Sequence, residues 1–347
     1  MGSEMCIRDR YKGEEAIGLK EKLDAILHIA LQKQATDIHF VSTTQGLSVT
    51  MRCEDGVLPI YSAAADKSLF NYLKYIAHLD LGLGQTAQSG NFQYEFQGEC
   101  LQFRFALLST LQKQTAVLRI LNNHTGICLE TLSDDKKQQQ IFHSWCQARN
   151  GLIVLSGPTG SGKTTTLHAM MQYIAKGGKQ RVVSLEDPIE IVDDSYLQLQ
   201  INEQHHFSYE EGIKELLRHD PDVIMIGEIR DPMSARMLMR SALSGHLIFT
   251  SVHAKSCLEV IYRLHEFGLS KEDLRQTLTG ITSQRLFHRR KGKGRVCIYE
   301  VLDQNEIITY FKQGELPSTH ENMEMQIASA IRAGTIQEEA QEDFLFR

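Results

Sequence analysis

Hydrophobic residues near the start of the chain recur every three or four positions, which is the spacing of one face of an α-helix. We predict this helix over 14–34 and a second one over 69–77. Short alternating or fully apolar runs around them predict strands at 38–41, 47–51, 92–96, 101–107 and 115–121, with a turn at Asp55-Gly56 and a glycine-rich loop at 81–91. Helices beside an antiparallel sheet indicate a small α+β domain, placed at 11–122.

The hydrophobic pattern changes in the second part of the chain. Residues 123–132 form a plausible linker, and Ser133 is the expected N-cap of the next helix. Beyond that helix, fully apolar strands alternate with helices, at Leu152–Leu155, Val182–Leu185, Val223–Ile226 and Leu247–Ser251. Continuous apolar strands of this kind are buried on both faces of a parallel α/β sheet. We therefore predict an α/β domain over 133–347, with a helical C-terminal part from about residue 268.

Composition narrows the class of protein. The 347 residues carry a net charge of −6, which argues against a general DNA-coating protein. The 7 cysteines contain no CxxC pair, so reduced, mostly buried thiols are expected, with neither disulfides nor a zinc site. No apolar run approaches the roughly 18 residues of a membrane span, so any membrane association would be peripheral. Residues 1–10 (MGSEMCIRDR) show no periodicity and resemble a non-native or disordered leader.

The most specific motif is GPTGSGKT, which follows an apolar strand and precedes a helix-compatible run. It matches the P-loop pattern G-x-x-x-x-G-K-[ST], whose backbone N–H groups surround phosphates at a helix N-terminus. ATP is the expected ligand. Lys163 is expected to span the β- and γ-phosphates, and the Thr164 hydroxyl to ligate Mg²⁺. The predicted nucleotide-binding residues are Gly157, Pro158, Thr159, Gly160, Ser161, Gly162, Lys163, Thr164 and Thr165.

Two carboxylates follow apolar strands and are candidates for the chemistry of hydrolysis. Glu228 ends the strand of DVIMIGEIRD, at the sheet edge where Mg²⁺ and the attacking water would lie. It is a candidate to hold Mg²⁺ or to activate water, against the alternative of a helix-capping acid. Glu186, in VSLEDPIE, is placed to act as a general base, against the alternative of an ordinary loop acid.

Histidines and arginines supply weaker candidates. His253 follows a buried strand at the catalytic edge and suits a γ-phosphate sensor, whereas His246 lies at the opposite end of that strand; either could be structural. Arg104 and Arg119 read from the residues alone as solvated strand arginines, with an arginine finger as the functional alternative. The basic stretch Arg285–Arg295 reads as a solvated, mobile loop, although it could touch lipid headgroups, nucleic acid or a partner.

Four boxes in this order resemble those of the secretion and type IV pilus assembly ATPase superfamily, the GspE-, PilB- and PilT-like traffic motors. They are GPTGSGKTTTL, SLEDPIE, LLRHDPDVIMIGEIRD and SGHLIFTSVH. The segments ATDIHF, MRCEDGVL, FRFALLST and AVLRIL are similar to the opening part of the family's sequence. The resemblance covers about residues 35 to 302.

The resemblance implies a RecA-like ATPase domain joined to a PAS-like N-terminal domain, assembled as a homo-hexamer. It makes Glu186 the water-activating residue and Glu228 the Walker B acid. It also makes Arg104 and Arg119 candidates to reach a nucleotide held between the two domains. The implied partner is a polytopic membrane platform protein at the inner face of the cytoplasmic membrane, with no direct contact to nucleic acid.

Departures from the family pattern point to a subgroup. QRLFHRRKGKGRVCIYEVL lacks the cysteine pairs of the zinc insert found in long assembly ATPases, and their extra docking domain is not expected. GRVCIYEVL favours the short competence (ComGA-type) ATPases over retraction motors. QSGNF lacks the arginine of the usual QDGRF, which leaves one nucleotide or interdomain contact in question.

We therefore predict a cytoplasmic ATPase that powers assembly of a competence pseudopilus for DNA uptake. The alternatives are a pilus retraction motor, a RecA-like nucleic-acid translocase and a nucleotide-gated scaffold.

Overall fold

The computed structural model describes residues 14–53, 56–60, 66–80, 87–110, 112–121, 128–201, 208–291 and 294–339. The chain divides into two compact units, Met1–Asn123 and His124–Arg347, each with its own hydrophobic core. The leader predicted at 1–10 lies outside the described residues.

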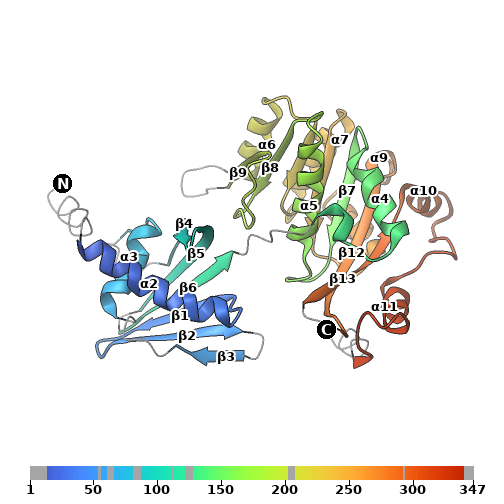
Figure 1. The fold of residues 1–347 in the computed structure, drawn as a ribbon. Coiled ribbons are helices and arrows are strands. Elements are labelled where there is room, and N and C mark those ends of the chain that lie inside the picture. Colours follow the sequence, from blue (N-terminus) through green and yellow to red (C-terminus); the bar gives the residue numbers. More distant parts are fainter. Residues whose placement is uncertain are drawn as a thin grey trace. The chain divides into compact units, whose positions relative to one another are not determined.

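The first unit is a six-stranded antiparallel sheet in the order β3-β2-β1-β6-β5-β4. Its strands are β1 (Asp37–Ser42), β2 (Leu47–Cys53), β3 (Gly56–Pro59), β4 (Gln88–Phe96), β5 (Glu99–Ser109) and β6 (Gln114–Leu121). Helices α2 (Glu14–Gln32) and α3 (Lys67–Ile76) lie over one face of this sheet (Figure 1). The predicted α+β arrangement of this unit is therefore observed.

An aromatic cluster fills the space between the helices and the sheet. Phe40, Phe70 and Phe105 pack with ring centroids 6.1–6.3 Å apart. All three are at most 1% exposed, and each such buried side chain contributes about 1.5–3 kcal/mol to folding. This aromatic cluster thus joins one helix, α3, to two strands that lie far apart in the sequence.

Two details of the first unit differ from the sequence prediction. Strand β3 was not predicted, and β4 begins at Gln88, inside the expected loop 81–91. The start of β4 was not predicted, because Ser89, Gly90 and Asn91 are small or polar and give no hydrophobic alternation. A Cβ atom at Gly90 would lie 1.9 Å from the carbonyl oxygen of Ala77, so glycine is needed where the end of α3 packs on the strand. The rest of that loop, 81–86, lies outside the described residues.

The second unit is built on a seven-stranded sheet in the order β13-β12-β7-β11-β10-β8-β9. All neighbouring strands are parallel except β13, which runs antiparallel to β12. The strands are β7 (Gly151–Ser156), β8 (Val182–Glu186), β9 (Leu197–Gln200), β10 (Val223–Ile226), β11 (Leu247–Val252), β12 (Leu278–His288) and β13 (Arg295–Leu302). The four predicted apolar strands correspond to β7, β8, β10 and β11 and are confirmed.

Helices cover both faces of this sheet. On one face α4 and α5 pack over alternate strand residues such as Ile153, Met225 and Phe249. On the other face α6 to α10 pack over the intervening residues, such as Val154 and Ile248. The helices are α4 (Lys136–Cys146), α5 (Lys163–Lys176), α6 (Tyr209–Leu217), α7 (Pro232–Leu243), α8 (Cys257–Glu266), α9 (Lys271–Thr277), α10 (Gln304–Gln313) and α11 (Met323–Arg332). The predicted α/β class of this domain is therefore confirmed, and its helices lie on both faces of the sheet.

The part of the chain after about residue 268 is not simply helical, which corrects the prediction. It contributes β12 and β13, which extend the sheet on one side of β7. The buried residues Thr282, Ser283 and Gln284 of β12 are polar, so no apolar run marked this strand. Gly280 is also required there, because a Cβ atom would lie 2.2 Å from the ring of Trp145. The predicted basic loop is a hairpin, since Arg285–His288 belong to β12.

The expected linker also differs in its second half. Leu129 and Leu132 are buried in the core of the second unit, around a short 3₁₀ turn at Leu129–Thr131. Asp135, rather than Ser133, is the N-cap of α4, because its side chain accepts the backbone N–H of Lys137. The residues 122–127 lie outside the described part of the chain.

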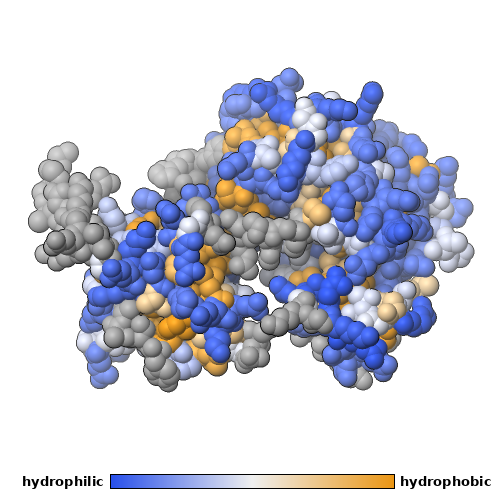
Figure 2. Space-filling model, in the orientation of Figure 1, coloured by the Kyte–Doolittle hydropathy of each residue, from blue (hydrophilic) through white to orange (hydrophobic). Residues whose placement is uncertain are grey.

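The described cysteines carry free thiols. Cys146 and Cys257 are buried, whereas Cys53, Cys128 and Cys297 are half-buried, so fewer are buried than the sequence suggested. Among the described residues, no helix is long and apolar enough to cross a membrane, and no group of three metal-ligating side chains is found. In the view of Figure 2 most of the described surface is hydrophilic, with hydrophobic residues gathered in smaller areas.

Candidate nucleotide-binding site

The phosphate-binding loop joins β7, an inner strand of the sheet, to helix α5, as Figure 1 shows. Gly157, Gly160 and Gly162 have φ angles of 143°, 79° and 90°, a region that favours glycine. A Cβ atom at Gly157 would lie 2.5 Å from the carbonyl oxygen of Gln284, so the loop lies directly against β12. Pro158 and Thr159 are exposed at the tip of the loop. The loop therefore combines the backbone freedom and the helix N-terminus that phosphate binding needs.

Lys163 and Thr164 form the first turn of α5. The Nζ of Lys163 donates to the carbonyl oxygens of Gly157 and Pro158, at 2.9 and 3.1 Å. Burial lowers the pKa of Lys163, while the charges of Glu228 and Glu190 act in the opposite direction. These two carboxylates therefore share the electrostatic environment of the lysine. Thr164 and Thr165 are half-buried beside it.

The buried side chain of Gln284, on β12, binds the phosphate loop from the side of the sheet. The Nε2 of Gln284 donates to the carbonyl oxygen of Ser161 at 2.8 Å and to the Oγ1 of Thr166 at 3.3 Å. Thr166 in turn contacts the hydroxyl of Tyr299 at 3.0 Å. Gln284 was not predicted as a functional residue, because its segment was compared with the family only for the absence of the zinc insert. Its signal was a long polar side chain within a run of otherwise small or apolar residues.

Glu228 and His253 come together at the carboxyl edge of the sheet, as their positions after β10 and β11 predicted. The Nε2 of His253 lies 3.0 Å from the Oε1 of Glu228, and Arg230 donates to the other oxygen at 2.8 Å. Arg230 also pairs with Asp187 at 3.4 Å. The Glu228 side chain is 16% exposed, so it is shielded and still open to solvent on one side. Arg230 was not predicted, although it stands two residues after Glu228.

Glu186 has different surroundings. It is 3% exposed, and one carboxylate oxygen lies 3.1 Å from the Nε2 of His168 on α5. The other oxygen accepts hydrogen bonds from Ser184 at 2.7 Å and Gln198 at 3.1 Å. Glu190, in the same SLEDPIE segment, is exposed and acts on Lys163 through its charge. The segment therefore offers one buried acid, Glu186, and two exposed ones, Asp187 and Glu190, and the sequence prediction singled out the buried one.

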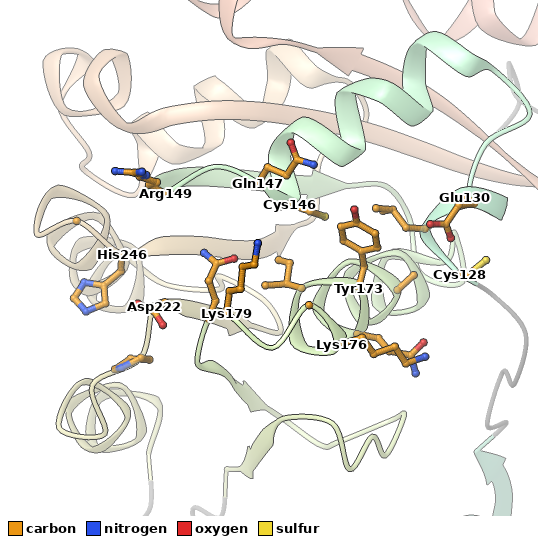
Figure 3. A pocket seen from close by; sticks show the side chains of 18 of the residues that line it. Cys128, Glu130, Cys146, Gln147, Arg149, Tyr173, Lys176, Lys179, Asp222 and His246 are labelled. Carbon is orange, nitrogen blue, oxygen red and sulfur yellow. The ribbon is translucent and has the colours of Figure 1, made fainter.

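His246 lies at the opposite edge of the sheet. Its Nδ1 is 3.0 Å from both the carbonyl oxygen of Ser241 and the Oγ of Ser244, so it binds the end of α7. A recess of about 1100 Å³ opens there, with His246, Arg149 and Tyr173 among its lining residues (Figure 3). Because this recess lies away from the phosphate loop, His246 has a structural contact and is separate from the nucleotide site.

Arg104 and Arg119 lie in the first unit, as register partners on β5 and β6. The same row across the sheet contains Asn91, Asp37 and Arg52. Arg119 is exposed, and its Nε donates to the Oδ1 of Asp37 at 2.8 Å; Arg104 is half-buried. The two arginines therefore sit together on the sheet face opposite to the core, and Arg119 already has an acidic partner.

The residues present fit a nucleotide with its magnesium ion. The glycine at 157 leaves no side chain in the cradle, and the Oγ of Ser161 is buried without a partner among the described residues. Lys163 carries a positive charge, and the hydroxyl of Thr164 and the carboxylate of Glu228 are oxygen groups of the kind that Mg²⁺ prefers. This fold and this site define a nucleotide-binding, ATP-hydrolysing enzyme of the RecA-like P-loop class.

Comparison with known proteins places the chain more closely. It belongs to the Type II/IV secretion system protein family, whose model matches residues 13–291. It is 33% identical over 263 residues to competence protein ComGA of Bacillus subtilis, which covers 75% of this chain and 74% of that protein. For competence protein ComGA of Halalkalibacterium halodurans the identity is 36% over 264 residues, or 75% of this chain and 76% of that protein.

A solved structure agrees with this placement. The pilus retraction motor PilT with bound ADP superposes with a TM-score of 0.75 at 25% identity, over 92% of this chain and 96% of that one. The ATPase DotB of Legionella pneumophila shares the fold, with a TM-score of 0.72 at 19% identity, over 93% of this chain and 95% of that one. The chain is therefore a traffic ATPase of the secretion and pilus class.

Proposed function

We propose that this traffic ATPase powers assembly of a pilus-like competence apparatus for DNA uptake. In this proposal it is a homo-hexamer in the cytoplasm, docked peripherally on a polytopic membrane platform protein. The observation that carries the cellular role is the similarity to two competence proteins over three quarters of the chain. The motor role rests on the phosphate loop and the Glu228–His253 pair at one edge of the parallel sheet.

The roles proposed for the residues follow from their positions. The amides of Gly157–Thr165 would bind the phosphates, and Lys163 would span the β- and γ-phosphates. Thr164 and Glu228 would hold Mg²⁺, which supplies neutralisation of the charge that develops on the phosphates. Glu186 would take the proton of the attacking water.

The remaining roles concern recognition of the γ-phosphate. His253, paired with Glu228 at 3.0 Å, would register the presence of that phosphate. Arg104 and Arg119 would stabilise the charge of the transition state from the first unit. Of the two, Arg104 is the stronger candidate, because Arg119 is bound to Asp37.

A retraction motor is the second candidate function, and the likeness to PilT favours it. Deletion of the gene distinguishes the two in the organism that encodes this chain. Loss of surface filaments and of DNA uptake is expected for an assembly motor, with restoration by the wild-type gene and no restoration by Lys163→Ala. An excess of filaments in the deletion strain would instead identify a retraction motor.

A nucleic-acid translocase makes a different prediction for the purified protein. The net charge of −6 favours a motor without direct DNA contact. ATP hydrolysis should therefore keep the same rate when single- or double-stranded DNA is added at low salt. A severalfold stimulation by DNA would overturn the pilus assignment in favour of the translocase.

A further inference from the structure

A chain of buried hydrogen bonds runs from the phosphate-loop helix to Glu186. His168 stands four residues after Thr164 on α5, so the two share one face of the helix, one turn apart. Its side chain is 5% exposed and its Nε2 lies 3.1 Å from the Oε2 of Glu186. On the other side of the ring, Nδ1 contacts the hydroxyl of Tyr196, which precedes β9. Both ring nitrogens are therefore engaged.

The two partners of the imidazole match one tautomer of the neutral ring. An ionised carboxylate only accepts hydrogen bonds, so a contact of 3.1 Å between the Oε2 of Glu186 and the Nε2 of His168 is a hydrogen bond when that nitrogen carries the hydrogen. In the neutral ring Nδ1 is then the acceptor, and the hydroxyl of Tyr196 is its donor. Burial, together with the charges of Glu186 and Asp193, raises the pKa of Tyr196, so its phenol keeps that proton. The tyrosine thus selects the tautomer that the carboxylate needs.

The same network leaves the carboxylate one free direction. Ser184 and Gln198 occupy the second oxygen of Glu186, at 2.7 and 3.1 Å. With His168 they fill three of its approximately four acceptor directions. A carboxylate held in this way has a fixed orientation and one acceptor direction that the described side chains leave unused. Because His168 belongs to the helix that begins with Lys163, the carboxylate is also fixed relative to the phosphate loop.

We propose that His168 is a positioning residue for ATP hydrolysis, which fixes the Glu186 carboxylate against the phosphate-loop helix and is itself held in one tautomer by Tyr196. The inference rests on the proposed role of Glu186 at the nucleotide site. His168 acts only through that carboxylate and does not touch the substrate. Its removal should therefore affect the rate of hydrolysis far more than the binding of ATP.

The test is steady-state ATP hydrolysis by the full chain with variants that separate hydrogen bonding from packing. His168→Leu removes the donor and should lower kcat about 10- to 100-fold, the range seen when residues that orient active-site ligands are replaced. The KM for ATP should change less than about threefold. His168→Gln keeps an N–H donor at a similar reach and should restore kcat to within about threefold of wild type. Tyr196→Phe should lower kcat by a smaller factor, because one tautomer is no longer selected.

A matched control and a double-mutant cycle exclude a purely structural role. His143 and Tyr173 form another histidine–tyrosine pair in this unit, with ring centroids 5.0 Å apart, and His143→Leu should keep the wild-type kcat. In the Glu186→Gln background, His168→Leu should cost little further activity, because the two residues act as one. Thermal unfolding of each variant checks that the fold is retained.

The outcomes separate the two proposals. A wild-type kcat for His168→Leu, or the same fold-loss in the Glu186→Gln background as in the wild type, overturns the role of His168 alone. The role of His168 is also contradicted if the His168→Gln variant is folded and its kcat is as low as that of His168→Leu. A wild-type rate for Glu186→Gln while Lys163→Ala is inactive overturns the proposed role of Glu186, and the inference with it.

Discussion

At the scale of single residues, the phosphate loop depends most on one lysine. Lys163 is half-buried and donates to two carbonyl groups of its own loop, in a position to exchange these contacts for phosphate oxygens. Burial lowers its pKa, and the nearby Glu228 and Glu190 oppose that shift. The surrounding acids therefore help to keep the lysine in the charged form that binds phosphate.

Replacing this lysine tests the assignment of the loop. Lys163→Ala should reduce ATP hydrolysis by at least about 100-fold, the effect of removing one preorganised group that stabilises developing charge. Lys176→Ala is the matched control, because Lys176 is an exposed lysine at the other end of the same helix. Its turnover should remain that of the wild type. Unchanged turnover in Lys163→Ala, measured by phosphate release, contradicts the assignment.

At the scale of elements, β12 links the phosphate loop to α4. The strand supports the loop through Gln284 and meets the ring of Trp145 at Gly280. Its register with β7 is interrupted between Leu278 and Gly280, so the strand bends where the tryptophan packs. A side chain at position 280 would have to displace either the ring or the strand.

This close contact predicts a large effect of a small substitution. Gly280→Ala should destabilise the second unit by about 1–3 kcal/mol, as for other overpacked cores. Each 1 kcal/mol lowers Tm by about 2–4 °C in a unit of this size. The measurement is thermal unfolding followed by circular dichroism. In a Trp145→Leu background the additional loss should be much smaller, because the clashing ring is absent. Additive losses would show that the ring is not the cause.

The elements also show where sequence patterns were informative. Strands β7, β8, β10 and β11 are continuous apolar runs, buried on both faces, and such runs predicted them correctly. Strand β12 buries Thr282, Ser283 and Gln284 instead, because these side chains bond to the backbone and to the phosphate loop. Hydrophobic periodicity does not mark a strand whose buried face is polar.

At the scale of the whole molecule, a buried histidine ties the C-terminal segment to the sheet of the second unit. His320 precedes α11, and its Nδ1 lies 3.2 Å from Glu306 on α10. Its Nε2 lies 3.4 Å from Glu300 on β13, which is an ion-pair distance. Burial alone would lower the pKa of His320, but these two carboxylates outweigh it and raise the pKa to about 9.

This shift makes the stability of the second unit depend on pH. A pKa raised from 6.5 to about 9 means that the stabilisation is fully present below pH 6.5 and is lost as the pH rises through 9. The loss should be on the order of 3 kcal/mol. Urea unfolding at pH 6.5, 7.5 and 9.0 should show this fall, and His320→Gln should remove it. His28→Gln, at an exposed histidine of α2, is the control that should retain it. A flat profile in the wild type contradicts the ion-pair account.

The arginines of the first unit give the test of an assembled active site. Arg104→Ala should lower ATP hydrolysis by the oligomer at least about tenfold, while an arginine finger is worth up to about 10³–10⁵. Nucleotide affinity of the protomer should stay the same. Arg104 is the better choice than Arg119, whose loss would leave the buried Asp37 without its partner.

Arg52 provides the matched control for that experiment. It is an exposed arginine in the same row of the sheet, as the register partner of Asp37. Arg52→Ala should keep the wild-type rate, measured at protein concentrations where the chain is oligomeric. Equal losses in Arg104→Ala and Arg52→Ala would indicate a general effect of charge on this face. Weakened nucleotide binding alone in Arg104→Ala would indicate a structural arginine.

The sequence by itself determined the class of the fold and the position of the phosphate loop. Both depend on local signals: apolar runs long enough for buried strands, and closely spaced glycines that can adopt the positive φ angles of the phosphate loop. The order of strands and motifs along the chain also placed Glu228 and His253 at one sheet edge, and they lie 3.0 Å apart.

Only the tertiary structure decided which side chains surround each candidate. The bond from Gln284 to the loop spans 123 residues of sequence, and that from Arg119 to Asp37 spans 82. Glu186 and Glu190 stand in one short acidic segment, yet one is buried against His168 and the other faces solvent. Burial and partners arise from contacts between distant segments, and no local pattern of residues contains that information.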